Sequence, residues 1–325
     1  MIELSASEDF FELQGQLDIV TSTQSKGWHS YKKSQGREIR YFVNDEAQPT
    51  IAVWGFMFKV PVLKKFLFVI EGMAHAQHLK ANVITKFFSQ LAQIDDFVGV
   101  DIDSNTVYNT SFEIGLRRAG FLRPLGSFNC PLTIEIDLQE PFRFDTNWKR
   151  NIKRTAGHNL IFEEKTHCSE ADIKAIVDLY REMNNLKGRA VGHRDYQIKA
   201  LVEEEDIRVF FVSSEDGEPL CARVIHCNDR FATDIFASNA LKSRECGASY
   251  FIVQELLELL KAEGYETFDF GRIGPSTHSA DSVYTFKKAS RGREVQYLGE
   301  FSCYKNKLIE LVLLVYKLKY KSPRY

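Results

Sequence analysis

The chain has 325 residues, and its 42 lysine and arginine residues against 44 aspartate and glutamate residues give a formal net charge of -2 at pH 7. This balance excludes indiscriminate binding to nucleic acid, because neutralising many phosphates needs a clear excess of basic residues; a local basic surface stays open. The length allows two domains with substantial cores.

Six cysteines are scattered along the chain, with no Cys-x-x-Cys pair and no histidine at zinc-site spacing; His75 and His78 have no third ligand nearby. We therefore expect no metal, no disulfide framework and a reducing cytoplasm. The acidic N-terminus does not resemble a signal peptide, and no segment approaches the roughly 18 apolar residues of a membrane-spanning helix. A cytoplasmic monomer is expected.

The first part of the chain predicts a hairpin, a helix and a strand. Residues 39–43 and 50–60 are strand-like and flank a polar turn. Residues 81–93 place apolar side chains at helical spacing and lead into a strand, residues 97–103, that ends in Asp103.

An alternating strand at residues 129–138 precedes a natural domain boundary near residue 145. A basic helix start follows, in which Lys149, Arg150, Lys153 and Arg154 fall on one helical face. That face suits a phosphate-bearing ligand, or it is an ordinary solvated surface.

The same arrangement then returns: strands at residues 207–212 and 220–226, a helix at residues 249–263, and a strand at residues 265–271. We therefore predict an α/β protein with mixed (α+β) sheets, made of two similar tandem domains that arose by internal duplication. The first would span residues 1–145, with a final helix at 305–325 packed on it, and the second residues 146–304.

The loop before the second helix carries Arg244, Gly247 and Ser249. It approximates the Arg/Gln-x-x-Gly-x-Gly/Ala loop by which GNAT acetyltransferases hold the pyrophosphate of acetyl-CoA at a helix N-terminus. An ordinary helix cap has a similar composition, so both interpretations stand.

The strand Phe268-Asp-Phe-Gly-Arg-Ile273 is followed by the pair Lys287-Lys288. The strand breaks at glycine, which places Asp269 near a sheet end that a ligand can approach. Lys287 could stabilise negative charge on a reacting carbonyl oxygen, or both lysines could be solvated loop charges.

The C-terminal segment, residues 308–316, is apolar and flanked by lysines, and it is too short to span a bilayer. It predicts either weak, salt-sensitive contact with the inner face of an anionic membrane or a final helix packed on the first domain.

Several motifs together resemble the Fem family, the FemX-like non-ribosomal aminoacyl-transferases that build peptidoglycan side chains on a double GNAT fold. They are residues 24–33, the hairpin 61–72 ending in Glu71-Gly72, Gly120-Phe121, residues 133–138, residues 150–154 and the segment 268–273. The chain departs from the family pattern at Arg272 and at Ala289-Ser290.

The resemblance implies transfer of an amino acid from aminoacyl-tRNA to an amine of a UDP- or lipid-linked muropeptide, without a covalent enzyme intermediate and without a bound cofactor. By position, Lys287 is the implied oxyanion-stabilising lysine. Lys32, four residues after Trp28, is the implied diphosphate ligand. The second phosphate ligand would be Arg189 or Arg194, near Tyr196.

Acyl transfer to an amine needs a deprotonated nucleophile, a polarised carbonyl and a grip on the donor. Asp103 or Asp269 could serve as base, or either could cap a neighbouring backbone. Donor contacts are expected from Arg150, Arg154, Arg244, Gly247 and Ser249. An acyl-CoA-dependent N-acyltransferase and a non-catalytic module that binds envelope precursors remain the alternatives to an aminoacyl-tRNA user.

Overall fold

The computed structural model describes residues 1–60, 65–124, 130–186, 192–273 and 282–320. The strands are β1 (Ile2–Leu4), β2 (Ile19–Val20), β3 (Ile39–Val43), β4 (Ile51–Lys59), β5 (Phe66–Ile70), β6 (Ala74–His75), β7 (Phe97–Val107), β8 (Leu132–Asp137), β9 (Ile161–Lys165), β10 (Ile207–Ser213), β11 (Pro219–Cys227), β12 (Phe231–Asn239), β13 (Thr267–Asp269) and β14 (Arg293–Tyr304). The helices are α1 (Ser7–Gln14), η1 (Ser22–Gln24), α2 (Lys26–Ser34), α3 (Ala81–Ala92), α4 (Thr110–Arg118), α5 (Thr146–Thr155), α6 (Glu170–Leu186), α7 (Asp195–Val202), α8 (Ser243–Cys246), α9 (Ala248–Ala262), α10 (Ser282–Ala289) and α11 (Lys307–Tyr320).

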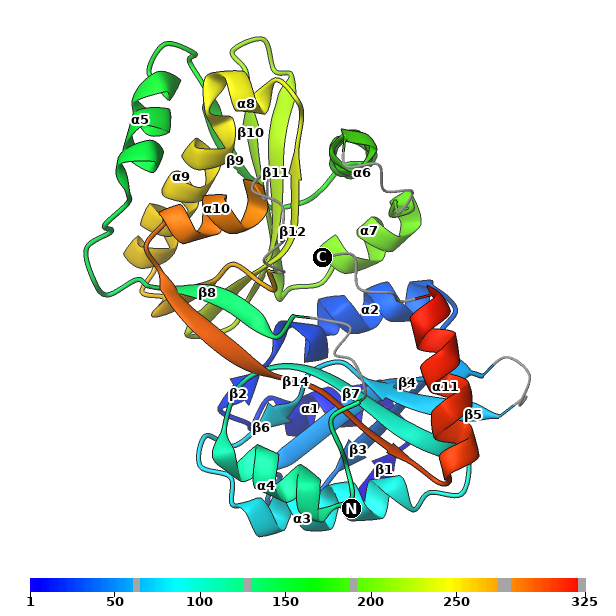
Figure 1. Ribbon diagram of the computed structural model, residues 1–325. Helices are drawn as coiled ribbons and strands as arrows, with labels where there is room; N and C mark the ends of the chain where they lie inside the picture. The colour runs from blue at the N-terminus through cyan, green and yellow to red at the C-terminus, as the bar shows by residue number, and fades with distance from the viewer. Residues whose placement is uncertain (61–64, 125–129, 187–191, 274–281, 321–325) are drawn as a thin grey trace.

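The strands follow the order β1-β3-β4-β5-β7-β14-β8-β13-β12-β11-β10-β9, while β2 and β6 pair with each other beside β4. Figure 1 shows two lobes, with β14 crossing from one to the other. Within the described residues the parallel pairs are β5 with β7 and β12 with β13, and the other pairs are antiparallel.

The two lobes repeat one plan, as predicted. Strands β3, β4 and β5, helix α3 and strand β7 form the first copy, and β10, β11, β12, α9 and β13 form the second. In each copy a three-stranded antiparallel meander is followed by a helix and then by a strand parallel to the third. The apolar stripe of each helix, such as Ile84, Phe87, Phe88 and Leu91 of α3, is buried in the core of its own lobe.

The lobes exchange strands at the predicted boundary. Strand β8 precedes residue 145, but it pairs with β13 and with the first residues of β14, in the second sheet. The remainder of β14 pairs with β7, in the first sheet. The buried N–H and C=O groups of a strand need partners, and sequence order does not tell which sheet supplies them.

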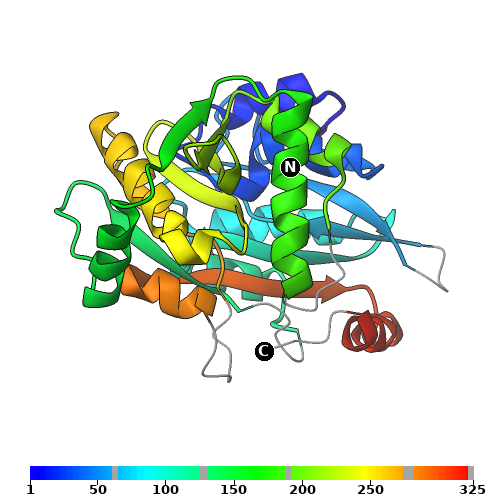
Figure 2. The same ribbon diagram turned by 90° about the horizontal axis from the view of Figure 1, so that it is seen from above.

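Helix α11 lies on the outer side of the first lobe in both views (Figures 1 and 2). Its residues Ile309 and Leu313 pack against Val60, Leu67 and Val98 of the first sheet. In the described part of the chain, no helix is long and apolar enough to cross a membrane.

Candidate active site

A cleft of about 270 Å³ lies between the two lobes. From the first lobe it is lined by Ser22, Thr23, Trp28, Glu71, Asp103 and Asn105, and from the second by Thr233, Asp234, Ile235, Gly271 and Arg272. Tyr297, on the shared strand β14, completes the lining. The carboxyl end of β13 therefore opens into the cleft, as the glycine break in the sequence indicated.

The end of β13 is held by Asp269. One oxygen of its carboxylate accepts hydrogen bonds from Thr133 Oγ1 (2.5 Å) and from the backbone N–H of Gly271 (2.8 Å), and the other accepts from the Tyr297 hydroxyl. Burial raises the pKa of Asp269. Asp269 thus caps the backbone after its own strand, one of the two roles proposed for it from sequence.

Gly271 is required for this turn. Its φ is +68°, and a Cβ atom at this position would lie 2.6 Å from the backbone oxygen of Asp234 on the neighbouring strand. No other residue fits without moving one of the two strands. The tight turn directs three successive carbonyl groups to one side of the chain.

Those carbonyls surround Lys287. Its Nζ donates to the oxygens of Phe270 (2.6 Å), Gly271 (3.2 Å) and Arg272 (3.4 Å). Lys287 belongs to helix α10, not to a loop as one interpretation of the sequence held. The structure thus brings Lys287 to the backbone that lines the cleft, whereas Lys288 points elsewhere and pairs with Glu294 at 2.5 Å.

Asp103 faces the second lobe across the cleft. Its carboxylate forms an ion pair with Arg272 at 2.6 Å, with both side chains about one quarter exposed (28% and 26%). The Arg272 guanidinium also lies over the Tyr297 ring, 5.8 Å from its centroid. Sequence reasoning noted Arg272 as a departure from the family pattern but did not place it in the site; its position directly after Asp-Phe-Gly was the available signal.

Trp28 and Lys32 lie on α2, on the first-lobe side of the site. The Trp28 indole N–H donates to Glu71 (2.7 Å), and Lys32 Nζ contacts the same carboxylate at 2.9 Å. Lys32 Nζ also lies 5.0 Å from the ring centroids of both Trp28 and Phe56. The predicted phosphate ligand is therefore mostly covered and already paired with Glu71, a partner that the sequence did not reveal.

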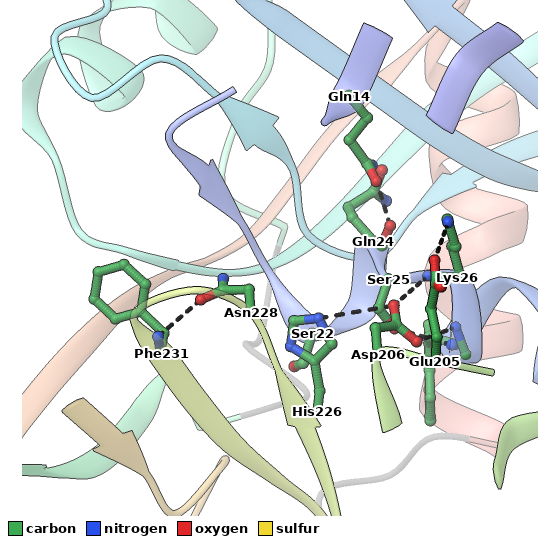
Figure 3. A network of polar contacts seen from close by, with 12 residues as sticks. Gln14, Ser22, Gln24, Ser25, Lys26, Glu205, Asp206, His226, Asn228 and Phe231 are labelled. Carbon is green, nitrogen blue, oxygen red and sulfur yellow. Dashed lines mark hydrogen bonds and ion pairs between the residues drawn. The ribbon is translucent and has the colours of Figure 1, made fainter. Parts of the chain in front are cut away.

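Helix α2 is joined to the second lobe at its N-terminus (Figure 3). The Asp206 carboxylate accepts hydrogen bonds from the backbone N–H groups of Lys26 (2.7 Å) and Gly27 (3.0 Å). A Cβ atom on Gly27 would lie 2.3 Å from Ile207 Cγ1, so glycine permits the close approach. This joint sets the position of Trp28 and Lys32 relative to the second lobe.

A buried histidine lies beside the joint. His226 Nε2 is 3.9 Å from the Asp206 carboxylate (Figure 3). Burial raises the pKa of Asp206 to about 6 and lowers the pKa of His226 to about 4. At neutral pH the pair is therefore a carboxylate beside a neutral imidazole.

Of the residues expected to bind the donor, Ser249 lies apart from the others. Arg150 and Arg154 lie one turn apart on α5, and Arg154 donates to the backbone oxygen of Arg244 on α8 (3.4 Å). Gly247, with φ +75°, directly precedes α9. Ser249 does not join them, because its hydroxyl donates inward to Asn239 at 3.0 Å.

Helix α5 also closes over the glycine. A Cβ atom on Gly247 would lie 2.8 Å from the backbone oxygen of Asn151. Helix α5 also contacts α10, where Trp148 stacks on Phe286 with ring centroids 4.8 Å apart. The basic helix therefore packs directly against the helix that carries Lys287.

The remaining predicted ligands are Arg189, Arg194 and Tyr196. Arg189 lies outside the described residues. Arg194 and Tyr196, at the start of α7, are exposed and are not among the described residues that line the cleft.

The cleft continues along the sheet of the second lobe. A cavity of about 230 Å³ shares Ser22, Asn105 and Thr233 with it and is also lined by Asp269 and Glu135. Glu135 in turn lines a cavity of about 550 Å³ that reaches Arg293. Asp269, Glu135 and Arg293 are direct cross-strand neighbours, so the adjoining cavities follow one face of the sheet.

Comparison with known proteins agrees with this architecture. Residues 143–288 match the model of the acetyltransferase (GNAT) domain family. A comparison with curated protein sequences gave no significant match.

Among solved structures the chain is similar to FemX, with 12% identity, a TM-score of 0.79, and 96% of this chain and 100% of that chain covered. It is also similar to L-PGS from Bacillus licheniformis (13% identity, TM-score 0.64, 96% of each chain covered). A tandem GNAT protein from the clavulanic acid biosynthesis pathway gives 10% identity and a TM-score of 0.53, with 94% of this chain and 98% of that chain covered. The chain therefore has the FemX-like fold of two tandem GNAT-like domains, and the match of its second half to the GNAT domain model supports acyltransferase activity.

Proposed function

We propose that the protein transfers an amino acid from aminoacyl-tRNA directly to an amine of a peptidoglycan or other cell-envelope precursor. The observation that carries this proposal is the ammonium of Lys287, held by the carbonyls of Phe270, Gly271 and Arg272 at the end of the strand that opens into the cleft. Such a fixed cation suits a developing oxyanion in acyl transfer.

In the proposed reaction the acceptor amine attacks the ester carbonyl carbon of the donor. A C–N bond forms, the C–O bond to the terminal ribose breaks, and the proton lost by the amine ends on the departing ribose hydroxyl. Lys287 would stabilise the oxyanion by exchanging one of its two longer contacts, to Gly271 or Arg272, for the substrate oxygen.

Asp103 is the better placed of the two candidate bases. It lines the cleft, where its carboxylate forms an ion pair with Arg272. Asp269 accepts hydrogen bonds at both oxygens from Thr133, Gly271 and Tyr297, so we assign it to positioning the end of β13.

The basic helix α5 favours a polyanionic donor. Arg150, Arg154 and Arg244 offer cations to a phosphate backbone, and the stack of Trp148 on Phe286 links this helix to α10 and Lys287. A donor bound along α5 would therefore lie beside the helix that carries Lys287.

The acceptor is proposed to occupy the interlobe cleft, against Trp28 and Arg272. Glu71 already neutralises Lys32, so a diphosphate would have to compete with that carboxylate. Arg272, which is paired with Asp103, is a cation in the lining of the cleft. Either a nucleotide or a lipid carrier is compatible with this placement, and both would be met at the cytoplasmic side of the membrane.

An acyl-CoA donor is the second candidate, because a left-handed glycine precedes the N-terminus of α9 and residues 143–288 match a GNAT acetyltransferase model. The contact between Gly247 and the Asn151 carbonyl argues against a pyrophosphate at this place, since a backbone oxygen there would face the phosphate oxygens.

Donor binding separates the candidates. The protein is titrated by calorimetry with aminoacylated tRNA and separately with acetyl-CoA, and each donor is then mixed with a muropeptide acceptor under single-turnover conditions. We expect heat and product with charged tRNA, and weaker binding when Arg150 and Arg154 are changed to Gln. Product from acetyl-CoA alone would replace the proposal with the second candidate; binding of the acceptor with turnover of neither donor would indicate a non-catalytic binding module.

A further inference from the structure

The C-terminal helix α11 buries a lysine and exposes a row of apolar side chains, the reverse of an ordinary surface helix. Lys317 points inward, where its Nζ pairs with Asp101 (2.6 Å) and donates to the Tyr304 hydroxyl (3.0 Å). Asp101 also accepts hydrogen bonds from Ser302 and Tyr304, both at 2.7 Å. This buried polar cluster, with Ile309 and Leu313, fixes the helix on the first lobe.

The outward face is apolar. Leu308, Leu311, Val315 and Leu318 are 67%, 56%, 58% and 53% exposed. Their spacing of three, four and three residues makes one stripe along the helix. A contiguous stripe of large apolar side chains on a helix surface marks an interaction site, whereas scattered single residues do not.

Lysines stand at both ends of this stripe. Lys307, with its side chain 88% exposed, begins the helix, and Lys319 lies in its last turn. The one acidic residue of the helix, Glu310, is paired with Lys307 at 2.8 Å. An apolar face with cationic ends is the pattern of helices that lie in the plane of a membrane surface.

A second copy of the chain fits this face poorly. The helix has 14 residues, about two heptads, and heptad pairing needs roughly three or more. In a parallel pair of helices each lysine would meet its own copy, and in an antiparallel pair Lys307 would meet Lys319, so either arrangement places like charges together.

We propose that the outward face of α11, formed by Leu308, Leu311, Val315 and Leu318, docks the protein on an anionic phospholipid surface. The four apolar side chains enter the headgroup region, while Lys307 and Lys319 contact lipid phosphates. Figures 1 and 2 show the helix at the edge of the molecule, where a flat surface can reach it. The inference is independent of the reaction that the cleft performs.

The test is flotation of the full chain with phosphatidylcholine vesicles, with and without phosphatidylglycerol. The wild type should bind the anionic vesicles, and high salt should weaken this binding. The double variant Leu311→Gln, Val315→Gln should lose more than about tenfold in binding, because two apolar side chains no longer enter the lipid. Glutamine is a good helix former, so α11 should stay folded, which thermal unfolding checks.

The matched control is the double variant Ile161→Gln, Leu241→Gln, at two similarly exposed apolar positions of the second lobe (49% and 47%). It should bind vesicles as the wild type does. Failure of the wild type to float with anionic vesicles, or equal flotation of the α11 variant, would overturn the proposal. Sedimentation equilibrium that finds a dimer in the wild type and a monomer in the α11 variant would also overturn it, in favour of a second copy.

Discussion

Strands β7 and β13 hold equivalent places in the two lobes, yet they end differently. Strand β7 continues past Asp103 to Val107 with β14 beside it, so its backbone stays in the ladder. Strand β13 stops at Asp269, turns at Gly271 and releases three carbonyls that gather around Lys287.

The helices that follow these strands, α4 and α10, differ in what their cationic side chains contact. In the first lobe, Arg117 of α4 pairs with Glu113 of the same helix at 2.9 Å. In the second, Lys287 of α10 reaches back to the strand end. Duplication thus supplied two similar frames, and the early end of β13 is what brings three carbonyls to a lysine.

The largest expected effect tests this cation site. Lys287→Ala should lower kcat about a hundredfold or more, because loss of one oxyanion donor costs about 2.7 to 4 kcal/mol in the transition state. Single-turnover transfer is the measurement, at a temperature where thermal unfolding shows the variant to be folded. Lys288→Ala, which changes the exposed neighbour, should leave kcat unchanged. Unchanged turnover in the Lys287 variant would remove Lys287 from the reaction.

The second largest effect is expected from a substitution in the turn at Gly271. Gly271→Ala should destabilise the protein by about 3 kcal/mol, because the new Cβ meets the Asp234 carbonyl and the backbone has a positive φ. Gly217→Ala is a matched control with φ +81° and nothing within 4 Å of the added Cβ, and should cost about 1 kcal/mol. Urea unfolding measures both, and equal losses would show that the close approach to Asp234 has no energetic consequence.

The joint between the lobes should respond to pH with opposite signs at its two residues. Burial raises the pKa of Asp206 to about 6, so its contribution to stability is present at low pH and is lost as pH rises through 6. Burial lowers the pKa of His226 to about 4, so its contribution is present above pH 6.5 and is lost as pH falls toward 4. In the wild type the two trends largely cancel.

Single variants separate the trends. Between pH 4 and 6, Asp206→Asn should gain stability relative to the wild type as pH rises, and His226→Gln should lose it. Each change should be on the order of 2 kcal/mol across the window. Urea unfolding at a series of pH values measures the slopes; slopes of the same sign in the two variants would contradict this account.

The smallest effect is expected for the ion pair between Arg272 and Asp103, which crosses the cleft. A double-mutant cycle of Arg272→Met and Asp103→Asn should give a coupling free energy of about 0.5 to 1 kcal/mol, because both side chains are partly exposed and solvent screens them. The coupling should fall at high salt. A coupling of zero at low salt would mean that the contact does not hold the lobes together.

Much of the frame was predictable from local pattern. The helical stripes of α3 and α9 and the two hairpins follow from periods of 3.6 and 2 in the apolar residues, which are properties of neighbours in sequence. The place of Lys287 at the end of β13 was also expected. The sequence could not indicate that Lys32 is neutralised by Glu71, 39 residues away, or that Arg272 reaches Asp103 in the other lobe.

By itself the sequence determined the duplicated plan, the strand that breaks at Gly271, and a lysine near that break, because periodicity and the demands of glycine act locally. The tertiary structure alone decided which strands exchange between the sheets. It also decided that both carboxylate oxygens of Asp269 accept hydrogen bonds. It also decided that α11 turns Lys317 inward and its apolar stripe of Leu308, Leu311, Val315 and Leu318 outward. These outcomes depend on which distant segments of the chain pack together. Tertiary packing decides whether a charged or apolar side chain is buried, and the residues next to it in the sequence do not.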